Sequence, residues 1–381
     1  MTPAHPTKPL ARVRRAVPVV ALAAVCGLAL TGCAIGPSEP PGQAGGAGGT
    51  GTVVLAVHDS FPNEEFAKAA SKATGYDVKV VSAGDGGELT NKLVLTKGAP
   101  IADAFFGADT IFASRLVEND VVVPYAPAGL PEGAEQYAVV DGTGSQSPPA
   151  DAVGETGLVP VDRGATCVNI DTEWFAAEGL EEPESYEDLA DPAYRDLTVL
   201  LDPTASSTGA SFLVGTVAKF GEDGFADYWK KLVDNGARIE QGWSDAYYGQ
   251  FTQGGEGGTR PIVVSYASSP AFTVNEEGTA TTTRALLDTC TRQVEYAGVL
   301  AGAANDAGAR AVVDYLVSTE FQRTIPDAMY MTPIDASVEM PEAWARFAPD
   351  PAAKQTFDLT PGEIERGREG WLKTLGEQIG L

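Results

Sequence analysis

The chain has 381 residues, of which 52 are acidic and 26 are basic, giving a formal net charge of −26 at pH 7. This excess of negative charge disfavours nucleic acids and anionic lipids as partners, because both would be repelled. The charge has two remaining interpretations, attraction of a cationic solute or simple solubility, and composition does not choose between them.

The first residues have the pattern of an export signal. Four basic residues precede an uncharged apolar run over residues 16–30, which is shorter than a membrane-spanning helix of about 20 residues. The run ends in the letters LTGC, which resemble the bacterial lipobox, whose cysteine is acylated and becomes the new N-terminus. We therefore expect a lipoprotein signal peptide over residues 1–32 and a lipid on Cys33. The alternative is an uncleaved apolar anchor.

A stretch rich in Gly and Pro follows the lipobox, over residues 33–51. It holds too few apolar side chains to form a core, so we expect a flexible tether, with the folded part beginning near Thr52. These features predict an extracytoplasmic protein held at the outer face of the cytoplasmic membrane by its lipid alone. That location argues against nucleotide-driven chemistry and favours a ligand met outside the cell.

Three successive strand, loop and helix units are expected after the tether, over residues 52–76, 77–98 and 102–120, and the segment VVVPYAP closes the run. This order predicts a parallel sheet with helices on its faces, where ligands bind beyond the carboxyl ends of the strands. Polar triplets fall at that edge after each strand. They are His58-Asp59-Ser60, Gly84-Asp85-Gly86 and Gly107-Ala108-Asp109.

A second block repeats the pattern, with a strand, a Ser-rich turn and a helix over residues 197–220 and a later strand over 260–272. Two extended apolar segments, 157–171 and 289–303, are expected to cross between two lobes. We expect lobe 1 over residues 52–162, completed by about 280–330, and lobe 2 over 163–279. A helical C-terminal region, 331–381, should cover the outer faces of the lobes.

Two cysteines remain after the leader and the lipid site, Cys167 and Cys290. In an oxidising compartment they could form one disulfide, and the alternative is a pair of buried thiols. His58 is the only histidine after the leader, so no cluster of Cys and His is available to hold a metal.

Seven segments of the chain resemble, in order, the bacterial thiamine-binding proteins of ABC uptake systems. They are HDSF, DGGELTNKL, ADAFFGAD, LDPTASSTG, QGWSDAYYGQF, VVSYASSPAF and IPDAMYMTPI, and the resemblance extends from about residue 53 to about residue 375. It implies an α/β fold of the two-lobed periplasmic-binding-protein type (type II), each lobe a mostly parallel sheet flanked by helices, with two crossover strands as the hinge. It also implies a non-enzymatic monomer that closes on thiamine or a thiamine phosphate and delivers it to the transmembrane subunits of an ABC permease, without a cofactor.

The resemblance places the ligand contacts on residues of both lobes. They are His58, Asp85, Gly86, Ser206, Trp243, Tyr266 and Phe272. His58 and Phe272 stand where the family has Tyr, so the imidazole would supply a stacking face and the phenyl ring would lack a hydroxyl.

The chemistry of thiamine agrees with these roles, because a flat aminopyrimidine and a thiazolium cation call for aromatic faces, each worth about 0.5 to 2 kcal/mol. Asp85, with Asp109 and Asp245 as weaker candidates, could accept from the exocyclic amine or balance the cation. Ser206 and Ser207 lie at an expected helix start, whose free N–H groups could receive a hydroxyl or a phosphate. Each feature also has an ordinary interpretation, as core packing, a turn or a helix cap.

Two other functions use the segment GWSDAYYGQF, residues 242–251. The letters GWSDA approach the nucleophile elbow of an α/β-hydrolase at Ser244, but such an enzyme needs a histidine after the serine, and none follows. The pair Tyr247 and Tyr248 could instead hold ferric iron, with His58 and a carboxylate completing the set of ligands. The hypothesis favoured by the sequence is a thiamine-binding lipoprotein with Trp243 in the pocket wall.

Overall fold

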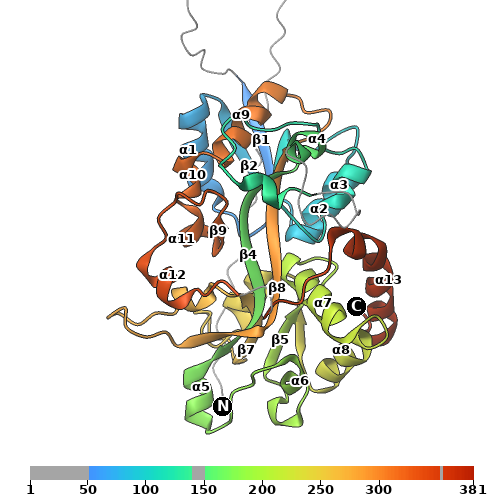
Figure 1. Ribbon diagram of the computed structural model, residues 1–381, viewed down its shortest axis with the longest axis vertical. Helices are drawn as coiled ribbons and strands as arrows, with labels where there is room; N and C mark the ends of the chain where they lie inside the picture. The colour runs from blue at the N-terminus through green and yellow to red at the C-terminus, as the bar shows by residue number, and fades with distance from the viewer. Residues whose placement is uncertain (1–50, 140–150, 352–354) are drawn as a thin grey trace, which may run out of the picture. The chain divides into compact units, whose positions relative to one another are not determined.

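The computed structural model describes residues 51–139, 151–351 and 355–381, which belong to one compact unit, Gly48–Leu381. One nine-stranded sheet runs through this unit in the order β2-β1-β3-β8-β4-β7-β5-β6, with β9 paired to β4 (Figure 1). Among the described residues, no helix is both long enough and apolar enough to cross a bilayer. The predicted signal peptide, the tether and Cys33 lie outside the described residues, apart from Gly51 at the end of the tether.

The strands are β1 Thr52–Val57, β2 Asp77–Ser82, β3 Ala104–Asp109, β4 Val159–Asp171, β5 Thr198–Leu201, β6 Arg238–Glu240, β7 Ile262–Tyr266, β8 Thr283–Val299 and β9 Thr332–Pro333. The α-helices are α1 Asn63–Thr74, α2 Gly86–Leu95, α3 Ser114–Glu118, α4 Ala152–Thr156, α5 Thr172–Glu178, α6 Tyr186–Leu189, α7 Ser207–Phe220, α8 Phe225–Asp234, α9 Asp306–Leu316, α10 Thr319–Gln322, α11 Ile325–Met329, α12 Glu342–Phe347 and α13 Pro361–Ile379. Single turns of 3-10 helix cover Ala134–Tyr137, Pro192–Tyr194 and Ser269–Phe272, and a π-helical turn covers Asp245–Gln250.

Two parallel regions lie at the ends of the sheet. At one end β1 pairs in parallel with β2 and β3, and at the other β5 pairs in parallel with β6 and β7. The long strands β4 and β8 join these regions, because β3 pairs with β8, β8 with β4 and β4 with β7, all antiparallel. The predicted crossover segments are these two strands, although β8 begins at Thr283, earlier than expected.

Each end of the sheet has its own hydrophobic core. One group of buried side chains surrounds β1, β3 and α9, with Phe66, Phe106 and Leu316 among its members. A second surrounds β5, β7 and α7, with Phe212 and Trp229 among its members. We call the first part lobe 1 and the second lobe 2, and the arrangement is the two-lobed α/β fold that the sequence predicted.

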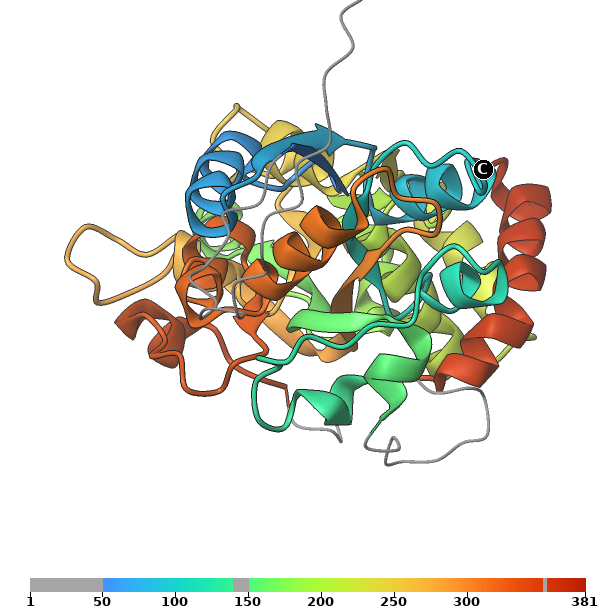
Figure 2. The ribbon, with the colours of Figure 1, turned by 90° about the horizontal axis from the view of Figure 1, so that it is seen from above.

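The C-terminal helix α13 contacts both lobes. It packs against α8 of lobe 2 and α3 of lobe 1, and it lies along one edge of the unit in Figure 2. Its Arg368 is buried, donates to the carbonyl of Ile111 at 2.6 Å and lies over the ring of Phe112. Trp371 and Leu375 on the same helix belong to the core of lobe 2.

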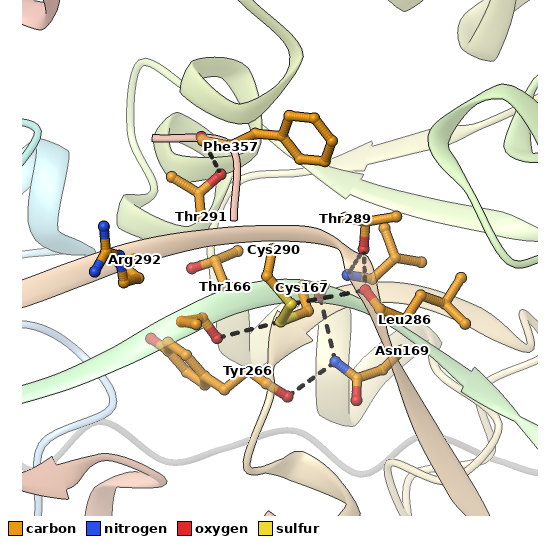
Figure 3. Close-up of a disulfide and its surroundings, with 12 residues drawn as sticks. Thr166, Cys167, Asn169, Tyr266, Leu286, Thr289, Cys290, Thr291, Arg292 and Phe357 are labelled. Atoms are coloured by element: carbon orange, nitrogen blue, oxygen red, sulfur yellow. Dashed lines mark hydrogen bonds between the residues drawn. A yellow bond between two sulfur atoms is a disulfide. The ribbon is translucent and has the colours of Figure 1, made fainter. Parts of the chain in front are cut away.

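A disulfide joins Cys167 on β4 to Cys290 on β8 (Figure 3). Both residues are fully buried, and the bond lies where the pairing of the two strands shifts register. The amide of Asn169 donates to the carbonyls of Cys167 and Tyr266, so the strand next to β4 is held at the same point. The disulfide therefore links covalently the two strands that connect the lobes.

Candidate ligand-binding site

A cavity of about 240 Å³ lies at the carboxyl ends of the lobe 1 strands, against residues of lobe 2. Its lining comes from the turn after β1, the residue before α2, the segment around Trp243, the end of β7, strand β8, and the end of α11 with the turn that follows it. The lining residues are His58, Asp59, Ser60, Phe61, Asp85, Trp243, Ser244, Tyr248, Tyr266, Glu295, Ala328, Met329, Tyr330 and Met331. A larger open hollow, about 480 Å³, lies beside Arg284 and Arg346, and none of the predicted site residues lines it.

Aromatic rings form much of the cavity wall. Trp243 stacks on Tyr247 with ring centroids 4.9 Å apart, and its indole N–H donates to the hydroxyl of Ser265 at 2.9 Å. The Trp243 ring also packs edge-on against Tyr248 and Tyr330. These contacts fix the orientation of the ring, so the wall is formed before a ligand arrives.

His58 lies in the turn after β1, with its ring tilted against Phe106 and edge-on to Phe61. The ring is held close to Gly107, where a Cβ atom would come within 2.3 Å of His58 Cδ2, and Gly107 has a φ of +104°. Only glycine tolerates both conditions, so the identity of this residue within β3 depends on the position of the imidazole. Burial lowers the pKa of His58, with the charges of Asp85 and Asp59 opposing the effect.

Asp85 joins the two lobes at the edge of the cavity. Its carboxylate caps α2 by accepting from Gly86 N at 2.6 Å, and it accepts from Ser207 N at 3.4 Å and Trp243 N at 3.0 Å in lobe 2. The neighbouring Gly87 N donates to the carbonyl of Ala205 at 2.9 Å. The structure therefore has the lobes in contact at this edge.

Three acidic side chains lie abreast beside the cavity. Glu295 on β8 is opposite Asp109 on β3 and opposite Asp162 on β4. Their exposed fractions are 5%, 0% and 0%. Burial raises the pKa of Glu295 and Asp162 well above the usual range, and it raises that of Asp109 to about 6. Among the three, Glu295 lines the cavity.

Comparisons with known proteins fit this architecture. A family model described as bacterial extracellular solute-binding protein matches residues 99–351. The chain belongs to this family of bacterial extracellular solute-binding proteins. It is 27% identical over 330 residues to the thiamine-binding periplasmic protein of Brucella suis, which covers 84% of this chain and 90% of the relative.

Two solved structures resemble this solute-binding protein. A periplasmic thiamin binding protein superposes with a TM-score of 0.71 and 25% identity, covering 86% of this chain and 96% of that chain. The iron-bound HitA of Pseudomonas aeruginosa superposes with a TM-score of 0.65 at 18% identity, covering 87% of this chain and 99% of that chain, which shows a shared fold.

Four of the predicted contacts of the solute-binding protein do line the cavity: His58, Asp85, Trp243 and Tyr266. Gly86 does not line it but packs against lobe 2, where a Cβ would come within 2.0 Å of Ser207 Oγ.

The remaining predicted contacts are fully or largely covered by protein. Ser206 caps α7 by accepting from Gly209 N, and Ser207 and Asp109 are buried where the lobes meet. Phe272 stacks on the far side of Tyr330, with ring centroids 3.5 Å apart, so it supports the wall without lining it.

Sequence reasoning missed other lining residues, among them the aromatic residues Phe61, Tyr248 and Tyr330 and the acid Glu295. Tyr330 has a φ of 62°, in the left-handed region that non-glycine residues rarely adopt, and it follows directly on α11. The segment IPDAMYMTPI carried a signal for it, because that segment belongs to the family resemblance. The sequence signal for Glu295 was an acidic residue within a segment that was expected to be an apolar strand.

Two residues central to the rival functions have ordinary structural surroundings. Ser244 has helical dihedral angles, φ −60° and ψ −42°, which differ from the strained turn of a nucleophile elbow, and its hydroxyl lies 3.1 Å from that of Ser60. Tyr247 is buried behind Trp243, and burial raises the pKa of its phenol. Within the described residues, no three His, Cys, Asp or Glu side chains are grouped so as to hold a metal ion.

Proposed function

We propose that this solute-binding protein captures thiamine between its lobes and delivers it to the transmembrane subunits of an ABC permease. It acts as a monomeric binding protein outside the cytoplasm, anchored by a lipid on Cys33, and it catalyses no reaction. The thiamine-binding relatives support the ligand, and the lipobox at residues 30–33 supports the anchor.

The observation that carries this proposal is the composition of the cavity wall. Aromatic side chains of both lobes surround a space whose lining includes the acidic residues Asp59, Asp85 and Glu295, with His58 as its one basic residue. Burial lowers the pKa of the imidazole, which disfavours its positively charged form. A planar aromatic cation can stack on the rings and make cation–π contacts with them, and its positive charge is attracted by the acids.

Unphosphorylated thiamine is the preferred form of the vitamin. The start of α7 would be the natural place for a phosphate, but the Asp85 carboxylate already accepts from Ser207 N there. A hollow of about 170 Å³ that adjoins the cavity has the acidic residues Asp59, Asp85, Glu88 and Asp245 in its lining. A phosphate in that place would meet four carboxylates and no lysine or arginine of its lining.

Titration of the purified protein with thiamine, thiamine monophosphate and thiamine diphosphate tests this function. Calorimetry should show saturable 1:1 binding of thiamine, and the two phosphates should bind about 10-fold or more weakly because of charge repulsion. Trp243 emission should change on binding, and excess thiamine should raise the melting temperature. Unchanged emission and melting temperature at large excess would contradict the proposal, whereas visible colour on addition of ferric iron would support the iron-binding alternative.

A further inference from the structure

The three buried acids beside the cavity, Asp109, Asp162 and Glu295, lie in a row, side by side on neighbouring strands. Residues directly opposite on neighbouring strands share a face of the sheet, and like charges placed there are destabilising. Within the described residues, none of the three forms an ion pair with Lys or Arg, and both carboxyl oxygens of Asp162 lack a geometrically sound hydrogen bond. A core that only needed packing would be more stable with apolar side chains at these positions.

Charged and titratable groups from several elements are in electrostatic range of the row. They are His58 after β1, Asp85 at the start of α2, Tyr266 on β7, Tyr296 on β8 and Arg368 on α13. His58 Nε2 lies 3.9 Å from Glu295 Oε2, too far for a hydrogen bond. Arg368 is in electrostatic range of Asp109 and is bound to the carbonyl of Ile111.

Burial without a Lys or Arg partner favours the protonated forms of Glu295 and Asp162. Burial is the main cause of the raised pKa values of Glu295 and Asp162, and the contact between the two carboxyls raises the pKa of Glu295 further while it opposes the rise at Asp162. Of the two, Glu295 lines the cavity, so its carboxyl is the one that can meet a ligand.

We infer that Glu295 is the residue that recognises the positive charge of the ligand, and that the Asp162–Glu295 pair releases a proton when the cation binds. The O–H bond of the Glu295 carboxyl breaks, the proton passes to the solvent, and the carboxylate that remains faces the cation. The inference rests on the proposed function and assigns the balancing of charge, which the sequence had given to Asp85, to Glu295. Asp85 is instead committed to three backbone N–H groups.

The affinity for a cation must then rise with pH. Because the pair ionises before or during binding, a more alkaline solution lowers the free-energy cost of that ionisation. The effect ends at the pH where the pair is ionised in the free protein as well. A neutral ligand of the same shape gains nothing from ionisation. The pair thus selects for charge, in addition to the selection for shape by the aromatic wall.

Calorimetry on the wild-type protein with two probes tests the inference. The probes are thiamine and its carbon analogue, in which carbon replaces the charged thiazolium nitrogen, each measured in buffers of different ionisation enthalpy. We expect proton release approaching one per thiamine and none for the neutral analogue, which should bind about 10-fold or more weakly. Thiamine that binds with a buffer-independent enthalpy would overturn the inference and leave the proposed function intact, whereas absence of thiamine binding would overturn both.

Three variants assign the proton. Glu295→Gln should abolish proton release and bring the affinities for the two probes close together, and Asp162→Asn should reduce proton release while binding persists. The control is Asp103→Asn, another buried acid, whose carboxylate accepts from Val54 N and Asn305 N away from the cavity. This control should keep the proton release of the wild type. If Glu295→Gln folds, as its melting transition reports, and still releases the proton, Glu295 is not the group.

Discussion

At the scale of single residues, the site combines residues whose surroundings oppose their usual protonation state or backbone conformation. Glu295 and Asp162 are buried carboxyls whose pKa values burial raises, His58 is an imidazole whose pKa burial lowers, and Tyr330 holds a left-handed backbone conformation. Each of these costs stability, because buried charge and a positive φ are both unfavourable. Their concentration around one cavity indicates selection for binding at the expense of stability.

The buried acids make the stability of the ligand-free protein depend on pH. A carboxyl whose pKa is raised by folding binds its proton more tightly in the folded state, so its contribution is complete below the unfolded pKa of about 4 and is lost as pH rises through the folded pKa. Asp162→Asn removes this loss. We expect the variant to be more stable than the wild type by about 1 to 3 kcal/mol in alkaline solution, where an ionised wild-type carboxyl would lie unpaired.

Urea unfolding of the ligand-free proteins across a pH series measures this difference. In mildly acidic solution the two proteins should differ less, since residue 162 is uncharged in both, as a protonated carboxyl in the folded wild type and as an amide in the variant. A variant that is equally destabilised at every pH would show that Asp162 stabilises the fold by a contact that does not depend on its charge.

At the scale of elements, the start of α2 is a surface through which lobe 1 contacts lobe 2. Gly86 and Gly87 bring this helix so close to lobe 2 that a Cβ on Gly87 would lie 2.7 Å from the carbonyl oxygen of Ala205 and 2.9 Å from that of Thr204. Backbone atoms cannot move aside as a flexible side chain can. The absence of side chains at these two positions is therefore a condition for the contact between the lobes.

Gly87→Ala should weaken binding without weakening the fold. The added methyl group prevents the closed contact, so the affinity for thiamine should fall about 10-fold or more, while the higher helix propensity of alanine offsets part of any loss of stability. Calorimetry gives the affinity, and small-angle scattering gives the distribution of open and closed forms.

The matched control for this variant is Gly370→Ala. Gly370 lies in α13, and its added Cβ would meet no atom within 4 Å. It should gain helix propensity and keep the wild-type affinity. Equal affinities of Gly87→Ala and Gly370→Ala would show that close approach of α2 is not needed for binding.

Prediction from the sequence succeeded where the signal was local. Apolar runs ending in polar turns located β1, β2 and β3, and with them the positions of His58 and Asp85 at one edge of the sheet. The family resemblance placed Trp243 and Tyr266 in the wall. It could not show that Phe272 and Ser206 are covered by other residues, because that depends on packing between distant segments.

The acidic row shows the limit of such reasoning most clearly. Asp109, Asp162 and Glu295 come from three separate strands, and only the register of β3, β8 and β4 brings them abreast. A shift of one residue in that register would turn Glu295 to the opposite face. Long-range pairing of this kind has no signature in a single sequence.

At the scale of the whole molecule, the disulfide joins the two strands that hold the lobes together. Cys167 and Cys290 are separated by 123 residues, so the bond restricts the unfolded chain over a long loop. Neither cysteine lines the cavity. The disulfide should therefore contribute to the stability of the fold and not to recognition of the ligand.

Replacement of both cysteines by alanine should lower the free energy of unfolding by about 2 to 5 kcal/mol and leave the affinity for thiamine unchanged. Urea denaturation gives the first quantity and calorimetry the second. The wild type in reducing buffer provides an independent comparison. A double variant with the wild-type unfolding midpoint would mean that the strand pairing alone fixes the hinge.

The position of β8 between β3 and β4 has a consequence for biosynthesis. An emerging nascent polypeptide presents β1, β2 and β3 first, yet the apolar edge of β3 stays unpaired until Thr283–Val299 arrives much later. An open apolar edge invites pairing with other chains, so chaperones have a long interval in which to engage this one. For a protein that works outside the cytoplasm, this late completion of the sheet keeps the chain unfolded enough to pass through a translocation pore.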